Sequence, residues 1–367
     1  TWETVITKNI GLDLGFLNNR LNVSFDAYIR DTKDMLMAGK TLPGVYGASS
    51  PRMNVADLRT KGWEASVTWR DSFTLADKPF HYRIVAGIGD NTSKVTKYDN
   101  PNRTLTDPYE GQQLGEIWGY VVDGYFKTDE EAKNYKVDQS FVNQMINASA
   151  LDNGLHAGDL KFVDLDGNNK IEQTTSANDR KDMKVIGNSL PRYNYNLGIS
   201  ADWYGIDFSV LFQGIGKQNW YPGAETSMFW GPYSRPYASF IPSNFMSQVW
   251  SEENTGAYFP RPRGYVALGS NRELGVVNTK YLQNLAYCRL KNLSIGYTLP
   301  DKWLSKIGFE KIRVYFSGEN LLTFTKLHSD YIDPEQASAS NSWKTSKSDA
   351  NIYPWAKTYS FGIDITF

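Results

Sequence analysis

The sequence predicts an all-β protein, a transmembrane antiparallel β-barrel, from two observations: side chains alternate along short stretches, and connection lengths alternate between them. In the last ten residues, TYSFGIDITF, every second side chain is apolar: Tyr359, Phe361, Ile363, Ile365 and Phe367. The side chains between them are small or polar. Alternation with a period of two is typical of a strand that has one apolar and one polar face. The chain is therefore expected to end on a β-strand.

Eight further stretches alternate in the same way, which makes nine predicted strands with the last one. They cover residues 9–16, 21–29, 63–70, 82–88, 193–203, 206–212, 293–299 and 312–316. Each is about long enough to cross a bilayer as a tilted strand. The apolar face would contact lipid, and the Asn, Asp, Ser and Gly side chains would line a wet lumen. Aromatic residues near the strand ends suit the interfacial girdles of such barrels: Trp203, Tyr204, Tyr297 and Phe367.

The connections between these stretches are alternately short and long. The long ones cover about residues 31–59, 91–191, 217–285 and 323–356, and a short one such as DSFTLADKPF stands between each pair. Membrane barrels have short periplasmic turns and long extracellular loops, whereas a soluble sandwich or propeller has no reason to place all long connections on one side. The pattern favours the membrane barrel over the soluble alternative.

The order of short and long connections also predicts the direction of the strands. The last strand follows a long loop, so it runs inward and places Phe367 at the periplasmic rim. The first of the nine strands is eight strands back, so it also runs inward, which places Thr1 outside. Bacterial single-chain barrels have even strand numbers and begin from the periplasm. Residues 1–367 are therefore expected to be the C-terminal part of a larger barrel.

Composition excludes several other classes of protein. The formal net charge of -1 gives no broad electrostatic basis for binding nucleic acid. Charged residues make up 22% of the chain, too many for a helical membrane protein. The single cysteine, Cys288, excludes an internal disulfide framework. No nucleophile elbow, HExxH pair or phosphate loop is present, so we expect no enzyme.

The stretch DLDGNNKI resembles the first half of an EF-hand-like loop and predicts a structural Ca²⁺ or Mg²⁺ site. Asp164, Asp166 and Asn168 would supply side-chain oxygens, and Lys170 its carbonyl. The twelfth position is Thr175 and not Glu, so the remaining ligand must come from elsewhere. Three acidic residues are candidates: Glu172, Asp179 and Asp182. The alternative is an Asx-rich turn without metal.

The connection at 217–285 is rich in aromatic residues, with arginines among them. The candidate substrate-binding residues are Trp220, Tyr221, Trp230, Tyr233, Tyr237, Trp250, Arg261 and Arg263. Aromatic faces with a few polar anchors suit sugar rings. Two alternatives remain open: the loop needs a small core of its own, or it contacts a partner protein, because interface centres favour Trp, Tyr and Arg.

Several segments resemble one known family. The stretch YCRLKNLSIGYTLPDKWLSKIGFEKIRVYFSGENLLTFTKLHSDYIDPE (287–335) is similar to the end of the SusC/RagA-type TonB-dependent outer-membrane transporters. Residues 54–70, 158–171 and 189–220 resemble the same family, so the likeness covers nearly the whole chain. The resemblance implies a 22-stranded barrel of which these are the last nine strands. It also implies that the plug, the TonB-engaging segment and the earlier strands lie outside this chain.

The function implied by the resemblance is nutrient import across the outer membrane. A SusC-like importer would take up oligosaccharides, with a SusD-like surface lipoprotein as a lid and with energy passed through TonB to the plug. The family also implies a dimer of transporter–lipoprotein pairs. Three alternatives remain: a RagA-like peptide importer, an outer-membrane receptor or adhesin that does not transport, and a soluble glycan-binding β protein.

Overall fold

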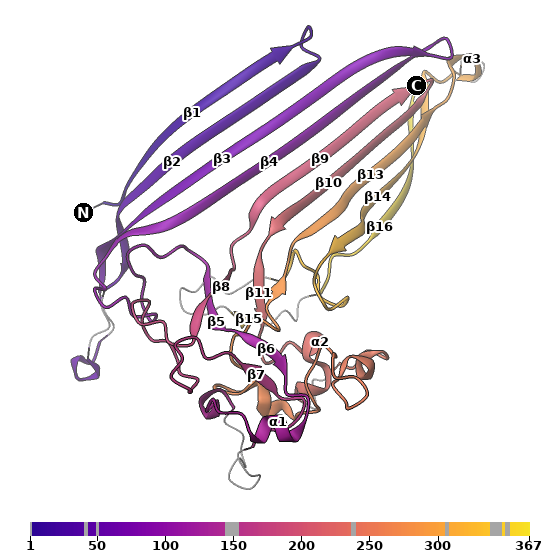
Figure 1. Ribbon diagram of the computed structural model, residues 1–367. Helices are drawn as coiled ribbons and strands as arrows, with labels where there is room; N and C mark the ends of the chain where they lie inside the picture. The colour runs from indigo at the N-terminus through magenta and orange to yellow at the C-terminus, as the bar shows by residue number, and fades with distance from the viewer. Residues whose placement is uncertain are drawn as a thin grey trace.

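The computed structural model describes residues 2–39, 43–48, 51–143, 154–235, 240–304, 308–337, 347–348 and 353–367. Its main feature is a nine-stranded antiparallel sheet, in which all nine expected strands are confirmed (Figure 1). In order across the sheet they are β1 (Thr4–Phe16), β2 (Leu21–Ala38), β3 (Arg52–Leu75), β4 (Lys78–Tyr98), β9 (Arg192–Trp203), β10 (Ile206–Lys217), β13 (Tyr287–Thr298), β14 (Lys311–Thr325) and β16 (Thr358–Thr366).

The sheet is a curved wall and does not close on itself. Within this sheet, each strand pairs with the strand that comes before it and the strand that comes after it in the sequence. Strands β1 and β16 form the two edges. Figure 1 shows the short turns gathered at one end of the wall, here called the turn end, and the long connections at the other, the loop end. This one-sided arrangement confirms the alternation of connection lengths. The structure contains a part of a barrel, and the total of 22 strands stays a prediction.

The register of the strands separates an apolar face from a polar face. One row across the sheet pairs Leu21 with Trp69, Trp69 with Ile84, and Ile84 with Ile199. On this face Ile10 is 73% exposed and Phe361 is 83% exposed, and no second sheet of the described residues packs on it. Such exposure in water would be costly, since burial of apolar surface is favourable by about 25 cal/mol per Å². This face is therefore the one that contacts lipid.

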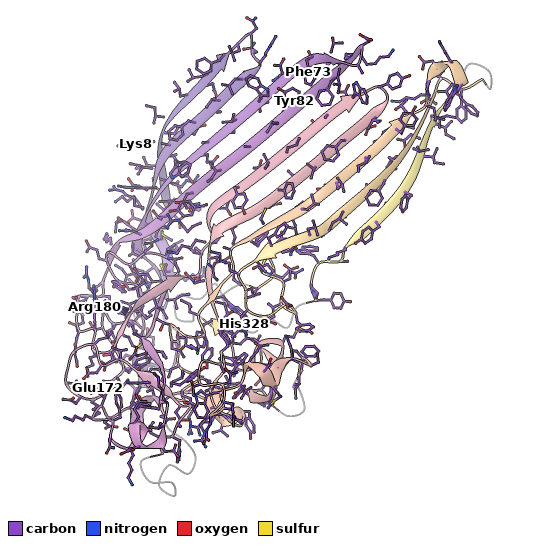
Figure 2. The ribbon with its side chains drawn as sticks, turned by 45° about the vertical axis from the view of Figure 1, so that its right-hand side comes forward. Lys8, Phe73, Tyr82, Glu172, Arg180 and His328 are labelled. Carbon is purple, nitrogen blue, oxygen red and sulfur yellow. The ribbon has the colours of Figure 1, made fainter. Side chains whose placement is uncertain are left out.

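The apolar band has the height of a membrane. On β3 it runs from Trp63 to Phe73, interrupted only by Asp71, whose carboxylate pairs with Arg20 near the end of the strand. This is about 33 Å along the strand, which a tilt of about 40° reduces to about 25 Å. Its inner border carries aromatic side chains, two of them labelled in Figure 2: the ring centroids of Phe73 and Phe80 are 5.0 Å apart, and the Trp69 indole donates to the Tyr82 hydroxyl at 2.9 Å. Two of the predicted girdle residues lie at the same end: the Trp203 indole donates to the Leu75 carbonyl at 3.1 Å, and the ring centroids of Trp203 and Tyr204 are 6.2 Å apart.

One turn is shorter than expected because its strands run further into it, whereas the predicted two-residue turn YG is confirmed. The β3–β4 turn consists of Ala76 and Asp77 alone, both with positive φ (48° and 59°). Tyr204 and Gly205 form the β9–β10 turn in the same way, with φ of 49° and 84°. Two-residue hairpin turns of this hand match the right-handed twist of the flanking strands. The expected ten-residue turn DSFTLADKPF is therefore wrong in its bounds, since most of it is strand.

The first long connection is also shorter than expected. Strands β2 and β3 continue their pairing beyond the apolar band, so the connection covers residues 39–51 and not 31–59. Ion pairs across this extension take over from apolar contacts: Arg59 Nε lies 2.6 Å from Asp31, and Lys33 Nζ lies 3.0 Å from Asp57. Hydrophobic periodicity carried no signal here because the apolar residues do not alternate with polar ones: Met35, Leu36 and Met37 follow one another directly.

The long connections contain short elements of their own. The strands are β5 (Glu116–Tyr120), β6 (Val122–Tyr125), β7 (Leu160–Phe162), β8 (Met183–Asn188), β11 (Asn219–Pro222), β12 (Gln283–Asn284) and β15 (Lys347–Ser348). The helices are η1 (Gly44–Tyr46), α1 (Asp129–Lys133), η2 (Ser140–Val142), α2 (Ser227–Trp230), η4 (Gly231–Tyr233), η5 (Phe245–Gln248) and η6 (Tyr265–Leu268), with α3 (Asp301–Leu304) at the turn end. No helix in the described ranges is long and apolar enough to span a membrane.

Candidate functional site in the outer loop assembly

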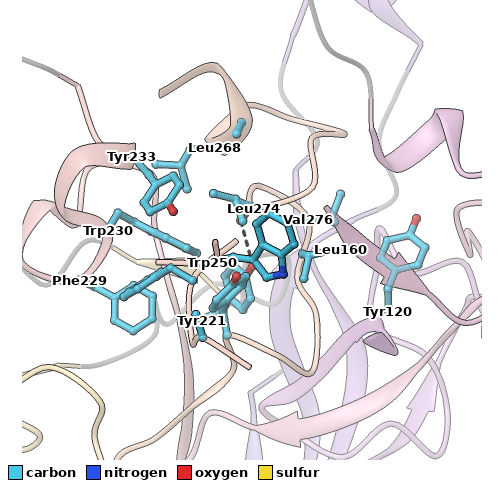
Figure 3. Packing of buried hydrophobic residues seen from close by; sticks show 14 of the residues in the cluster. Tyr120, Leu160, Tyr221, Phe229, Trp230, Tyr233, Trp250, Leu268, Leu274 and Val276 are labelled. Carbon is cyan, nitrogen blue, oxygen red and sulfur yellow. Dashed lines mark hydrogen bonds between the residues drawn. The ribbon is translucent and has the colours of Figure 1, made fainter. Parts of the chain in front are cut away.

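Three long connections fold together at the loop end into one compact unit, here called the outer loop assembly (residues 99–191, 218–286 and 326–357). Its core takes Leu160 from the connection at 99–191 (the first), Trp230 from the second, both labelled in Figure 3, and Leu327 from the third. Each of the three side chains is at most 6% exposed. The connections therefore stabilise one another through a shared hydrophobic core.

Four of the aromatic residues expected to bind substrate belong to this core. Trp220, Tyr221, Trp230 and Tyr233 are 0–1% exposed. Their polar atoms have partners inside the protein: the Tyr221 hydroxyl donates to the Leu274 carbonyl at 2.9 Å, and the Trp230 indole to the Gly223 carbonyl at 2.9 Å. A sugar ring stacks on an accessible aromatic face, and these four side chains offer none. Their burial supports the alternative that the long loop needs its own core.

Of the remaining aromatic candidates, Tyr237 lies outside the described residues, and Trp250 borders a surface cleft. Trp250 is 8% exposed and lines the cleft, of about 610 Å³, together with Arg261. Gly158 lies under both side chains with φ of +84°, and a Cβ there would approach Trp250 Cδ2 to 2.6 Å. Gly158 thus allows the indole to pack directly on the backbone.

The same cleft carries charged side chains that the sequence analysis missed. Lys127 and Asp129 come from the first connection, and Glu252 comes from the second. Arg261 is 34% exposed at its side chain, so its guanidinium is accessible to a ligand. Residues from two separate connections meet here only through tertiary packing, so no local pattern could have brought them together. What the cleft offers a ligand is mixed charge, since its aromatic residue Trp250 is itself only 8% exposed.

Arg263, the last of the predicted substrate-binding residues, is held in a buried ion-pair network. It pairs with Asp159 and, at 3.0 Å, with Glu273, and the three side chains are 11%, 0% and 1% exposed. The amide of His156 donates to Asp159 at 2.9 Å, and the amide of Leu160 donates to Glu273 at 3.3 Å. The network therefore fastens residues 156–160 to residues 263–273, a structural role.

Burial makes one carboxyl group of this network unusually basic. Desolvation, reinforced by the negative charge of Glu273, raises the pKa of Asp159 to about 7, although Arg263 and Arg261 oppose the change. A carboxyl group that shares one arginine with a second carboxylate retains its proton more readily in the folded state. The strength of this connection between the loops should therefore depend on pH.

The predicted cation loop brings three carboxyl groups together. Oxygen atoms of Asp164, Asp166 and Asp182 lie within 4.8 Å of one another. The turn is shaped by the Asp164 carboxylate, which accepts from Gly167 N and Asn169 N, each at 2.7 Å. Asn169 adopts φ of +62°, the conformation in which EF-hand loops usually place glycine. Of the three candidate closing residues, Asp182 is the one that reaches the cluster.

The other candidate ligands have other partners. The Asn168 amide oxygen accepts from Lys170 N at 2.8 Å, and its amide nitrogen donates to Asp166 and Glu172. Glu172 also pairs with Lys181 at 3.4 Å. Asp179 lies in the following turn, where its amide donates to Ser176. A bound ion would require Asn168 and Glu172 to exchange these bonds for metal contacts.

Two carboxyl groups of the cluster, Asp182 and Asp164, differ in how readily they ionise, and only the ionised form binds a cation. Burial raises the pKa of Asp182, and the charges of Asp166 and Asp164 add to the rise. Burial also acts on Asp164, but the amides of Asn169 and Gly167 outweigh it and lower the pKa of that carboxyl. A divalent ion would remove the repulsion among the three groups.

The three histidines lie in separate places and do not form a shared catalytic centre. His81 pairs with Asp202 at 2.8 Å in the wall, and His156 lies 3.6 Å from Asp129 in the first connection. His328 stacks on Tyr258, with ring centroids 3.5 Å apart. Each histidine thus has a packing or hydrogen-bonding partner of its own.

Comparison with known proteins assigns the fold. The sequence model of the family described as TonB dependent receptor-like, beta-barrel matches residues 1–321. The chain belongs to this family. TonB-dependent receptors lie in the outer membrane, so the turn end of the wall faces the periplasm and the loop end faces the cell exterior.

The individual relatives are longer than this chain. TonB-dependent receptor P3 of Formosa agariphila is 28% identical over the whole chain, which covers 34% of that protein. TonB-dependent receptor SusC of Bacteroides thetaiotaomicron is 24% identical, with 32% of its length covered. A structure of the RagAB peptide importer in its open-open state superposes with a TM-score of 0.70 at 21% identity, and supports the fold. The chain thus spans about a third of the relatives it matches.

Proposed function

We propose that this chain forms the wall and outer loops of a SusC-like importer that takes up oligosaccharides across the outer membrane. The observation that carries the proposal is the pairing of a lipid-facing wall with a folded loop assembly on its outer side alone. A receptor or adhesin that uses the membrane only as an anchor does not require a wide barrel wall with a polar inner face. The similarity to SusC over the whole chain supports the same function.

The proposed importer works with partners outside this chain. A SusD-like lipoprotein closes over the outer loop assembly, and TonB transmits energy to a plug in the part of the protein that precedes these strands. Transporter–lipoprotein pairs assemble into dimers. The residues described here supply the barrel wall, the lumen surface and the outer loops, and they make or break no covalent bond.

The cleft at Trp250 and Arg261 is the proposed contact for the nutrient. The guanidinium of Arg261 beside Lys127, Asp129 and Glu252 can bind hydroxyl groups of a sugar, and the Trp250 indole, only 8% exposed, forms part of the cleft wall. The four charged side chains also suit the charges of a peptide, which is why peptide import is the second candidate. The peptide importer RagAB shares the fold, and this adds no evidence on the nutrient.

Uptake by the full-length protein tests the function. A strain that carries the gene should take up labelled oligosaccharides or oligopeptides, and deletion should abolish the uptake of one class only. Arg261→Ala should lower the affinity for that class, while Arg103→Ala, an exposed arginine in the first connection, should not. Unchanged uptake of both classes in the deletion strain would contradict an importer.

We also propose that Asp164, Asp166 and Asp182 bind Ca²⁺ or Mg²⁺ as a structural ion. Hard oxygen ligands suit both ions, and Ca²⁺ tolerates the irregular geometry of such a turn better. The ion would stabilise the first connection and take no part in transport.

A further inference from the structure

The polar face of the wall has a hollow near the turn end, distant from the outer loop assembly. Its volume is about 700 Å³, and side chains from β2–β4, β9 and β10 or their turns surround it. Its charged residues are Arg20, Arg70, Asp71, His81, Arg83, Asp202 and Asp207. The hollow therefore lies on the lumen side of the wall, close to the periplasmic rim.

Every carboxylate of this hollow is already paired. Arg20 contacts Asp71 at 3.2 Å, and His81 contacts Asp202 at 2.8 Å. Asp207 pairs with Arg313, which reaches across from β14 at 2.7 Å. The two remaining cations of the hollow, Arg70 and Arg83, therefore have no carboxylate of the hollow as a partner.

Those two cations, Arg70 and Arg83, lie directly opposite each other in the register of β3 and β4. Both point to the lumen, because they alternate with the lipid-facing Trp69 and Ile84. Both are exposed, and neither side chain has an ion pair or a hydrogen bond within the described ranges. Like charges directly opposite in a strand pair destabilise it.

We propose that Arg70 and Arg83 form an anion-binding site that binds a carboxylate side chain of the protein segment filling the barrel. Two guanidinium groups side by side can bind a carboxylate through paired, charge-assisted hydrogen bonds. Outer-membrane transporters of 22 strands have a plugged lumen, and about two thirds of the relatives' length lies outside this chain. The site rests on the proposed importer, since it needs an occupied lumen.

A resident carboxylate fits the site better than one on a passing nutrient. The repulsion between the two arginines acts at all times, so only a partner that is bound between transport events offsets it continuously. The hollow also lies at the turn end, because residues 18–20 of the β1–β2 turn line it, whereas the nutrient enters from the loop end. The site would hold the lumen segment against the wall until energy from TonB displaces it.

The test uses the full-length transporter in the outer membrane, with influx of vancomycin as the measure of an open lumen. The double variant Arg70→Gln/Arg83→Gln should raise influx about tenfold, the shift expected from losing one charge-assisted pair. Arg70→Lys/Arg83→Lys, which keeps the charge, should raise it much less. Arg30→Gln is the matched control, because Arg30 also alternates onto the lumen face of β2 but lies outside the hollow. Heat-modifiable migration confirms that each variant folds.

Uptake of the nutrient separates the two sources of the carboxylate. If influx stays at the level of the wild type and only uptake of acidic nutrients falls, the arginines serve the nutrient and the proposal is overturned. If neither influx nor uptake changes, it is overturned as well. Normal uptake by the wild type with a raised influx in the double Gln variant supports both the importer and the site. Absence of uptake by the wild type would instead count against the importer, on which the site depends.

Discussion

The wall and the outer loop assembly use the same types of side chain in opposite ways. On the wall, Phe361 is 83% exposed and Ile10 is 73% exposed, whereas Trp220 and Trp230 in the assembly are fully buried. Lipid surrounds the exposed side chains of the wall, whereas the hydrophobic effect buries the side chains of the assembly away from water. The comparison teaches that an aromatic residue in such a chain is interpreted from its periodicity and surroundings, since its type alone does not distinguish a lipid contact, a core residue or a ligand contact.

The largest expected effect is on the assembly core. Trp230→Ala removes a fully buried indole and should destabilise the outer loop assembly by about 3–5 kcal/mol. Limited proteolysis should then cleave the long connections while the barrel keeps its heat-modifiable migration. Trp303→Ala, at the exposed α3, is the control and should leave the cleavage pattern unchanged. Loss of the barrel together with the loops would show that the two regions do not fold separately.

A charge on the wall should have a smaller effect that depends on the face. Val67→Arg places a guanidinium among lipid-facing residues and should cost about 2–4 kcal/mol, near the middle of the apolar band. The neighbouring Ser66→Arg points to the lumen and should cost about 1 kcal/mol or less. Urea unfolding of the full-length protein in lipid vesicles measures both. Equal costs would contradict the assignment of the two faces.

Acidity should strengthen the assembly and leave the wall unaffected. The folded-state pKa of Asp159 is raised, so the stability that it contributes is fully present below its ordinary pKa of about 4 and is lost as the pH rises through about 7. Protease resistance of the long connections should therefore be greater at pH 5 than at pH 8. Asp159→Asn should remove this dependence. The same trend in that variant would show that another group is responsible.

The smallest expected effect is that of a cation. Saturating Ca²⁺ or Mg²⁺ should stabilise the connection at 99–191 by up to about 3 kcal/mol, visible as a shift of its thermal transition. Asp166→Asn should abolish the shift. Asp179→Asn is the matched control, because Asp179 lies outside the cluster. If the control variant lost the shift as well, the ion would bind elsewhere.

The sequence predicted the wall well and the assembly poorly, for a physical reason. Alternation along a strand is local, so all nine strands, the girdle near Trp203 and the one-sided loops were visible without any long-range contact. Burial in the assembly depends on contacts between separate connections. The sequence therefore could not show that Trp230 is covered by residues from elsewhere, nor that Lys127 and Arg261 share a cleft.

The cation loop falls between these two cases. Its first half is a local motif, and Asp164 and Asp166 lie together as predicted. The closing carboxylate comes from Asp182, which approaches through the fold of the connection, and the sequence could only name it as one of three candidates. The Arg70–Arg83 pair had no local signal at all, because β3 and β4 bring the residues together through their register.

Oxygen accessibility of spin labels along β3 tests the central claim most directly. In the full-length protein with Cys288→Ser, single cysteines at residues 63 to 69 carry a nitroxide label in lipid vesicles. Labels at positions 63, 65, 67 and 69 should be relaxed strongly by oxygen, which concentrates in lipid, and those at 64, 66 and 68 should not. Accessibility without this alternation, or stronger relaxation on the even positions, would contradict a wall with lipid on one face and a lumen on the other.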